Sequence, residues 1–121
     1  MYQDNITLCG ASAYEKKFYI NKDFNALQDH VKKELQIMCV LFTEEIGGIF
    51  TLEFDDHGNL QFKTEATEAD GFYDDIGGAL KIKKLRVEKE ELLESLEMYY
   101  KVFFLGDIPE EELKKTPGSE D

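Results

Sequence analysis

Apolar and polar residues alternate most regularly between residues 49 and 66, and this period of two predicts a β-hairpin. The apolar positions on the two sides of the polar gap are Phe50, Leu52, Phe54, Leu60 and Phe62. Residues that face each other across a hairpin share one side of the sheet, so Phe54 is expected to face Leu60. This register leaves a three-residue loop, 56–58, in which Gly58 takes the left-handed conformation.

A period near four residues predicts a long helix over residues 26–46. The apolar face of this helix consists of Leu27, Val31, Leu35, Met38, Phe42 and Ile46. The segment from Ile37 to Phe42 is apolar on all sides, so we expect it to be buried on more than one side. Gly47 and Gly48 are expected to end the helix, because glycine readily adopts the left-handed conformation found at helix C-termini.

A second helical pattern occupies the C-terminal part of the chain. Its main apolar face consists of Leu85, Leu92, Leu96, Tyr99 and Phe103, with Leu93, Tyr100 and Phe104 beside it. An unbroken helix over residues 72–104 would be about 50 Å long, whereas a globule of this size has a radius of gyration of about 14 Å. We therefore expect the helix either to break near Gly77 and Gly78 or to protrude into a partner.

Residues 16–20 carry two conflicting signals. Phe18 and Ile20 fall on one face of an extended segment, which is typical of a strand. Ser12 and Glu15 have the spacing of a capping box, which favours a helical turn. We favour the strand.

These elements predict an α+β fold: an antiparallel sheet that contains the 49–66 hairpin, packed by the 26–46 helix and by the long C-terminal helix. The length of 121 residues fits one domain. We assign residues 1–106 to a single α+β domain. Residues 107–121 carry six acids, two lysines and two prolines, so we expect an acidic, disordered tail.

The formal charge of −12 is unevenly distributed. Residues 44–75 contain ten acids and one base, for a net charge of −9, whereas residues 76–89 contain five bases and one acid, for +4. Nucleic acid is not expected as a partner, because phosphate contacts need a positive surface. The acidity suits a cytoplasmic protein or one that meets a basic protein partner. The chain has no signal-peptide pattern, and its longest apolar run is too short to span a bilayer, so no membrane association is expected.

Two nine-residue segments, 42–50 and 72–80, share a phenylalanine, two adjacent carboxylates and Ile-Gly-Gly at the same offsets. The match fades immediately outside the segments, so we reject an internal repeat. The later carboxylates fall at the start of a helix, where the helix dipole stabilises them. The earlier carboxylates fall at a helix end, where the dipole disfavours them, and they are the more interesting pair.

Two sets of charged side chains are candidate sites. A possible acidic pocket of an enzyme or ligand-binding protein comprises Glu44, Glu45, Asp74 and Asp75. A possible patch for an anion or a partner protein comprises Lys81, Lys83, Lys84 and Arg86. A solvated helix face is the more common meaning of such charge runs.

Few residues fit catalytic or metal chemistry. The possible nucleophiles and bases are Cys9, Cys39, Ser12, Ser95, His30 and His57. We assign them structural or surface roles, because no motif places a nucleophile beside a base. Adjacent carboxylates on a helix point about 100° apart and cannot face one ion together. Neither glycine pair has the spacing of a phosphate loop, so no metal and no cofactor are expected. Cys9 and Cys39 are too few for a disulfide framework and are expected to be reduced.

At LCGASAYEKKFYINKDF, ELQIMCVLFTEEIGGIFTLEFDDHGNLQF and LESLEMYYKVFFLG the chain resembles a family of short, uncharacterised bacterial proteins classed as a domain of unknown function. The likeness covers nearly the whole chain up to Gly106. The resemblance implies a bacterial, cytosolic, stand-alone domain. It implies no activity, cofactor or catalytic residue.

The function that we expect is that of a non-enzymatic cytoplasmic module that self-associates or binds a protein partner. The alternatives are a small enzyme or ligand-binding protein with an acidic pocket, and an acidic inhibitor or immunity-type protein that blocks a basic toxin. A homodimer is expected because the C-terminal helix carries a wider apolar stripe than one sheet face needs. In such a dimer the bases of residues 81–89 could meet the acidic region 44–75 of the second copy.

Overall fold

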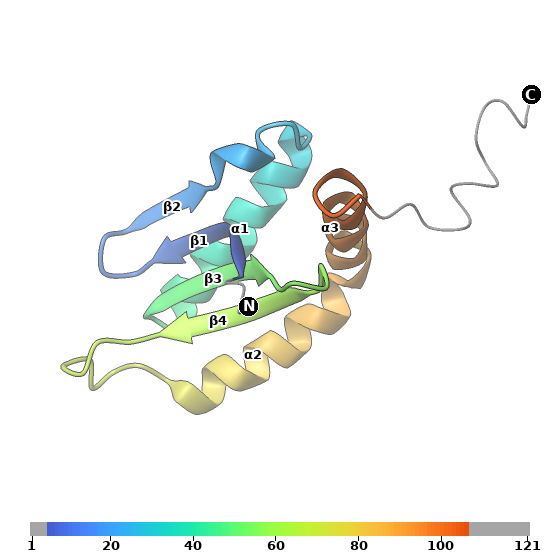
Figure 1. Ribbon diagram of the computed structural model, residues 1–121. Helices are drawn as coiled ribbons and strands as arrows, with labels where there is room; N and C mark the ends of the chain where they lie inside the picture. The colour runs from blue at the N-terminus through green and yellow to red at the C-terminus, as the bar shows by residue number, and fades with distance from the viewer. Residues whose placement is uncertain (1–4, 107–121) are drawn as a thin grey trace, which may run out of the picture.

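The computed structural model describes residues 5–106, which form one sheet and a set of helices (Figure 1). The elements in chain order are β1 (Ile6–Ser12), β2 (Lys17–Ile20), the 3₁₀ helix η1 (Lys22–Phe24), α1 (Asp29–Glu45), β3 (Ile49–Phe54), β4 (Leu60–Glu65), α2 (Asp75–Glu88) and α3 (Glu90–Phe103). The expected α+β architecture is confirmed: an antiparallel sheet contains the hairpin, and helices pack on it. The tail predicted for 107–121 lies outside the described residues.

The four strands are all paired antiparallel, in the order β2-β1-β3-β4. The hairpin β3–β4 has the predicted register, with Phe54 opposite Leu60. The strand favoured near residues 16–20 is confirmed as β2. The Ser12 hydroxyl accepts a hydrogen bond from the Glu15 N–H at 3.2 Å. Ser12 and Glu15, whose spacing resembles a helix cap, therefore close the turn between β1 and β2.

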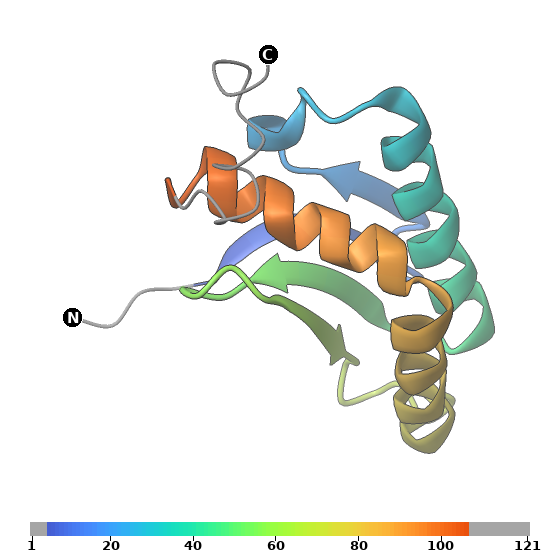
Figure 2. The ribbon, with the colours of Figure 1, turned by 90° about the vertical axis from the view of Figure 1, so that its right-hand side faces the viewer.

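Helices α1 and α3 pack on the apolar face of the sheet (Figure 2). Phe50 of β3 stacks on Phe42 of α1 with ring centroids 3.9 Å apart. Phe54 of β3 stacks on Tyr100 of α3 at 4.2 Å. Phe50 and Phe54 point to the same side because side chains alternate along a strand. The opposite face carries polar residues such as Glu53, which is typical of an antiparallel sheet with one solvent-exposed face.

Helix α1 begins at Asp29, slightly later than the sequence pattern indicates. The chain before it forms η1, where the Asn21 side chain accepts a backbone hydrogen bond inside the turn at 2.9 Å. This turn places Phe24 fully inside the core. The helix ends as predicted at the glycine pair, where Gly47 has a φ of +97°.

The C-terminal helix breaks at Lys89, so the prediction of a break near Gly77 and Gly78 is wrong. The Asp74 side chain accepts a hydrogen bond from the Gly77 N–H at 2.9 Å, so α2 begins at the next residue and continues through both glycines. A Cβ on Gly78 would lie 3.2 Å from the Ile46 side chain. The glycine therefore permits close packing on α1, while the break at Lys89 (φ −108°, ψ 23°) turns α3 across the sheet (Figure 2).

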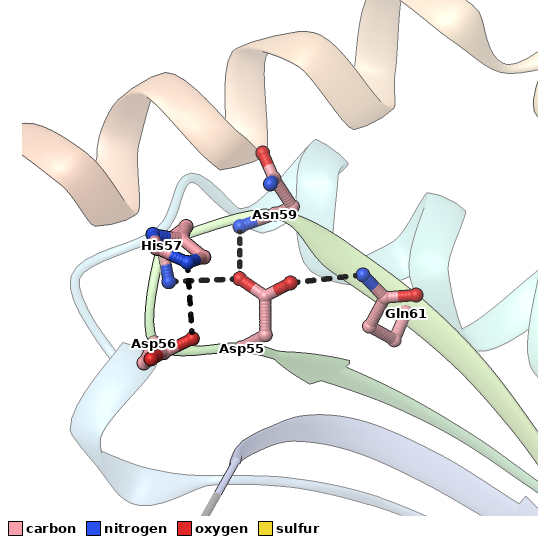
Figure 3. Close-up of polar contacts among 5 residues, drawn as sticks. All are labelled: Asp55, Asp56, His57, Asn59 and Gln61. Atoms are coloured by element: carbon pink, nitrogen blue, oxygen red, sulfur yellow. Dashed lines mark hydrogen bonds and ion pairs between the residues drawn. The ribbon is translucent and has the colours of Figure 1, made fainter. Parts of the chain in front are cut away.

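A hydrogen-bonded cap closes the tip of the β3–β4 hairpin (Figure 3). One carboxylate oxygen of Asp55 accepts hydrogen bonds from the backbone N–H groups of His57 and Asn59, both at 2.9 Å. The other oxygen accepts a hydrogen bond from the Gln61 side-chain amide at 3.0 Å. Gly58 has a φ of +84°, as the three-residue loop predicts.

The hairpin tip is fastened to both C-terminal helices. The Leu60 N–H donates a hydrogen bond to the Glu97 carboxylate of α3 at 2.8 Å. The Leu60 carbonyl accepts one from the Arg86 guanidinium of α2 at 3.3 Å. The tip therefore serves as a docking point that fixes where α2 and α3 lie on the sheet.

The substitution Gly58→Ala should lower the free energy of unfolding by about 1–2 kcal/mol, because an L-residue is strained in the left-handed conformation. The added Cβ would also lie 2.8 Å from the Lys101 side chain of α3, which would have to move. Gly71→Ala is the matched control, since nothing lies within 4 Å of its added Cβ. Urea unfolding of both variants measures the difference, and equal stabilities would contradict the described turn.

Burial raises the pKa of Asp55, but hydrogen bonds from Asn59, Gln61 and His57 outweigh it and hold the pKa below its ordinary value. The ionised carboxylate thus favours the folded state at neutral pH. Asp55→Asn should cost about 1 kcal/mol at neutral pH. This difference should persist down to the unfolded-state pKa of about 3.9 and vanish as the pH falls through the lower folded-state value.

Unfolding curves of the wild type and Asp55→Asn at several pH values test this linkage. Asp56→Asn is the control, because the Asp56 carboxylate is exposed and accepts no backbone hydrogen bond within the described loop. A stability difference for Asp55→Asn that stays constant into strong acid would refute the assignment.

Candidate functional site

The four carboxylates of the predicted acidic pocket lie in different surroundings. Glu44 lines a cavity beside the β1–β2 turn. Glu45 forms an ion pair with Lys81 at 3.0 Å. Asp74 caps α2, and Asp75 is exposed in the first turn of that helix. Of the two cavities in the structure's described part, one is lined by Glu44 alone among these four carboxylates and the other by none of them. A pocket shared by the four carboxylates therefore stays a prediction.

Most of the predicted basic patch is engaged within the chain. Lys81 and Lys84 form ion pairs with carboxylates of α1 and α2, at 3.0 and 3.8 Å. The Arg86 guanidinium lies over the Phe62 ring, 4.7 Å from its centroid. Lys83 is the member of the patch that makes no ion pair or ring contact with another described residue. The patch therefore helps to hold α2 in place.

Two ion pairs place α1 and α2 side by side. Glu45 near the end of α1 pairs with Lys81 near the middle of α2. Glu34 near the start of α1 pairs with Lys89 at the end of α2, at 3.3 Å. Positions that rise along α1 fall along α2, so the two helices run antiparallel.

The two cysteines meet in the core between β1 and α1. Cys9 and Cys39 are fully buried free thiols, and their sulfur atoms lie 3.9 Å apart. The contact with the Cys39 thiol, together with burial, raises the pKa of Cys9 well above its ordinary value. A neutral, buried thiol is a poor nucleophile, so this pair contributes packing.

The two histidines lie at separate places on the surface. His57 is exposed at the hairpin tip, 3.7 Å from the Asp56 carboxylate. His30 lines an open cavity of about 640 Å³ where α1 meets the junction of α2 and α3. Within residues 5–106, no group of three or more His, Cys, Asp or Glu side chains is arranged to hold a metal ion.

A second cavity, of about 500 Å³, lies between β2 with its preceding turn and the C-terminal half of α1. Phe18 and Val40 supply apolar walls, and Lys16, Lys17 and Glu44 supply charges. The sequence pattern gives no signal for this cavity, because its two walls come from separate elements that only the fold brings together.

The outer face of α2 is apolar although it is turned to solvent. Ile76, Leu80 and Val87 expose 77%, 62% and 76% of their surface. The spacing of these residues puts them on one side of the helix, opposite Leu85, which is buried against the core. Helix α2 therefore presents apolar side chains on two opposite faces.

The exposed apolar surface lies only partly where the sequence indicates. On α3, Leu96 and Tyr100 are buried in the core, whereas Phe103 exposes 71% of its surface. On α1, Ile37 and Leu41 each expose 53% of their surface, so the expected burial of that segment on several sides is wrong. The spacing of Ile76, Leu80 and Val87 fits one face of a helix and could have indicated this exposed apolar face. Lysines that fall between these residues in the sequence obscure the pattern.

No described helix has the length and apolar composition that crossing a bilayer requires. No curated protein and no solved structure matches the chain. A family model described as a family of unknown function, DUF6145, matches residues 5–108, which is most of the chain. The chain therefore belongs to DUF6145, a family of unknown function.

Proposed function

We propose that this protein is a non-enzymatic, cytoplasmic interaction module that forms a homodimer through the outer face of α2. The observation that carries the proposal is the exposure of Ile76, Leu80 and Val87 on one helix face. A surface helix of a monomer needs only one apolar stripe, directed at its own core. Each of these side chains would contribute about 1.5–3 kcal/mol if it were fully buried.

The charges around this face favour a second copy as the occupant. A net charge of −12 makes most of the surface of one chain repel another. Lys81, Lys84 and Lys89 are balanced by Glu45, Glu88 and Glu34 within the same chain, while Lys83 and Arg86 form no ion pair with a described carboxylate. These two bases leave this face slightly basic, so two copies repel each other less here than across the acidic remainder of the surface.

A twofold arrangement fits a single helix face. Two copies of α2 can pack antiparallel with Leu80 near the centre of the contact, so that each stripe covers the other. Closed twofold pairing is the commonest solution for soluble oligomers. Because three of the five bases of residues 76–89 are already paired inside each chain, we expect apolar contact, rather than ion pairs between the copies, to hold the dimer.

Light scattering at micromolar concentration should give about twice the 14.0 kDa mass of one chain. The dimer should persist in about 1 M salt, where the Debye length is about 3 Å. Leu80→Lys should give a folded monomer, because it places a charge at the centre of the contact. Met98→Lys on α3 is the control, since Met98 is an exposed apolar residue away from α2.

A wild-type mass near that of one chain would end the proposal. If the dimer dissociates in high salt, pairing between the acidic and basic regions, and not apolar contact, holds the two copies together. If the dimer survives Leu80→Lys but not Met98→Lys, the contact between the copies lies on α3 and not on α2.

A further inference from the structure

The loop that joins β4 to α2, residues 66–74, turns an aromatic side chain into solvent (Figure 1). Phe72 exposes 96% of its surface, more than any other large apolar residue in the described part of the chain. A phenyl ring in this position keeps a large apolar area in contact with water, and burial of that area is strongly favourable. Phe72 is therefore the apolar side chain that gains most from being covered.

The backbone on both sides of Phe72 is fastened to the folded domain. The Asp70 carboxylate accepts hydrogen bonds from the Tyr14 hydroxyl of the β1–β2 turn at 2.5 Å and from the Phe72 N–H at 3.1 Å. On the other side, the Tyr73 ring lies against Gly48, where an added Cβ would be only 2.6 Å from the ring. The backbone at Phe72 is thus fixed before a partner binds, so little conformational entropy is lost when the ring is covered.

The loop and its two junctions are acidic. Residues 65–75 contain no lysine, arginine or histidine, and their formal charge of −5 comes from five acids: Glu65, Glu68, Asp70, Asp74 and Asp75. None of the five forms an ion pair with another described residue. These negative charges are therefore not offset by contacts within the described domain.

The neighbouring β1–β2 turn does not reverse this charge. It adds Glu15 and Lys16, followed by Lys17 at the start of β2, so one acid and two bases change the total from −5 to −4. Attraction of a partner over a distance of several ångströms depends on this net charge more than on the direction of each side chain. This end of the domain therefore attracts positively charged molecules.

We propose that the β4–α2 loop is a docking site for a basic partner protein, which receives the Phe72 ring in an apolar pocket bordered by lysine or arginine side chains. The ring supplies most of the affinity, as a central aromatic anchor does in protein interfaces. The carboxylates steer the partner to the loop and raise the association rate. Nucleic acids and anionic membranes are repelled by the same carboxylates.

A second copy of the chain fits this loop less well. Its formal charge is −12, and three of the five bases in its residues 76–89 are already paired within the chain. Of the other two, the Arg86 guanidinium lies over the Phe62 ring and donates a hydrogen bond to the Leu60 carbonyl. The inference therefore goes beyond the proposed dimer and does not rest on it, and Leu80→Lys should leave binding of the basic partner unchanged.

Photo-crosslinking identifies what covers the ring. The full chain with Phe72→p-benzoylphenylalanine is expressed in the cells that produce the protein and is irradiated there. The matched control carries the same photoreactive residue in place of Phe103, which exposes 71% of its surface on α3. The adducts of position 72, and not those of position 103, should contain a protein of positive net charge.

The crosslinked protein is then purified, and its affinity for variants of the chain is measured by calorimetry. Phe72→Ser should weaken binding at least about tenfold, because the anchor is lost from the contact. Phe103→Ser is the control and should change the affinity less than about twofold. Because both side chains are exposed, both variants should unfold in urea at the wild-type concentration.

Charge variants test the steering independently. Glu65→Gln with Glu68→Gln should lower the association rate constant about three- to tenfold at low salt, while Glu90→Gln with Glu91→Gln at the start of α3 should change it less than about twofold. Equal rates for the two double variants would refute the steering by this loop.

The proposal is overturned if position 72 crosslinks to no protein or to an acidic one, or if Phe72→Ser binds as tightly as Phe103→Ser. A crosslink from position 72 to a second copy of the chain also overturns it and assigns the loop to the dimer contact. A basic protein at position 72, together with the mass of a single chain in light scattering, would end the dimer and support this inference.

Discussion

An aromatic cluster at one end of the sheet holds the fold together. Phe54 of β3 stacks on Tyr100 of α3 with ring centroids 4.2 Å apart. Phe24 of η1 stacks on both Phe54 and Phe104, at 5.6 and 4.8 Å. Three segments far apart in the chain therefore meet in one cluster. Deleting one of these rings would leave a cavity that the other segments could not fill, at a cost of about 3–5 kcal/mol.

The position of the other helices follows from this cluster. Tyr100 can reach Phe54 only because the chain turns at Lys89. The backbone of Leu60 at the hairpin tip then forms hydrogen bonds with Glu97 and Arg86. This arrangement commits the inner sides of α1, α2 and α3 to the core. Part of the remaining apolar surface lies on the outer side of α2, and Phe103 on α3 is exposed as well. The β2 edge and the cavity beside it lie on the other side of α1. The surface proposed as the contact between copies is therefore among those that the core leaves uncovered.

The elements set by local chemistry could be predicted from the sequence. The hairpin register and the conformation of Gly58 followed from strict alternation and a three-residue loop, and both are confirmed. The break at Lys89 could not be predicted, because Gly77 and Gly78 look like a hinge until Gly78 is seen to pack against the end of α1 and Gly77 against its own helix cap, Asp74. The ion pairs of Lys81 and Lys89 with α1 were missed for the same reason: contacts between distant elements have no local signature. The cavity between β2 and α1 likewise exists only in the folded chain.

Hydrogen exchange of the wild-type protein at several concentrations tests most directly whether the outer face of α2 is a contact between copies. The account predicts that amides in residues 75–88 exchange more slowly as the concentration rises, while those of β2 do not change. The exposed side chains of Ile76, Leu80 and Val87 lie within this range. Exchange in α2 that is independent of concentration, or slowing confined to another element, would contradict the account.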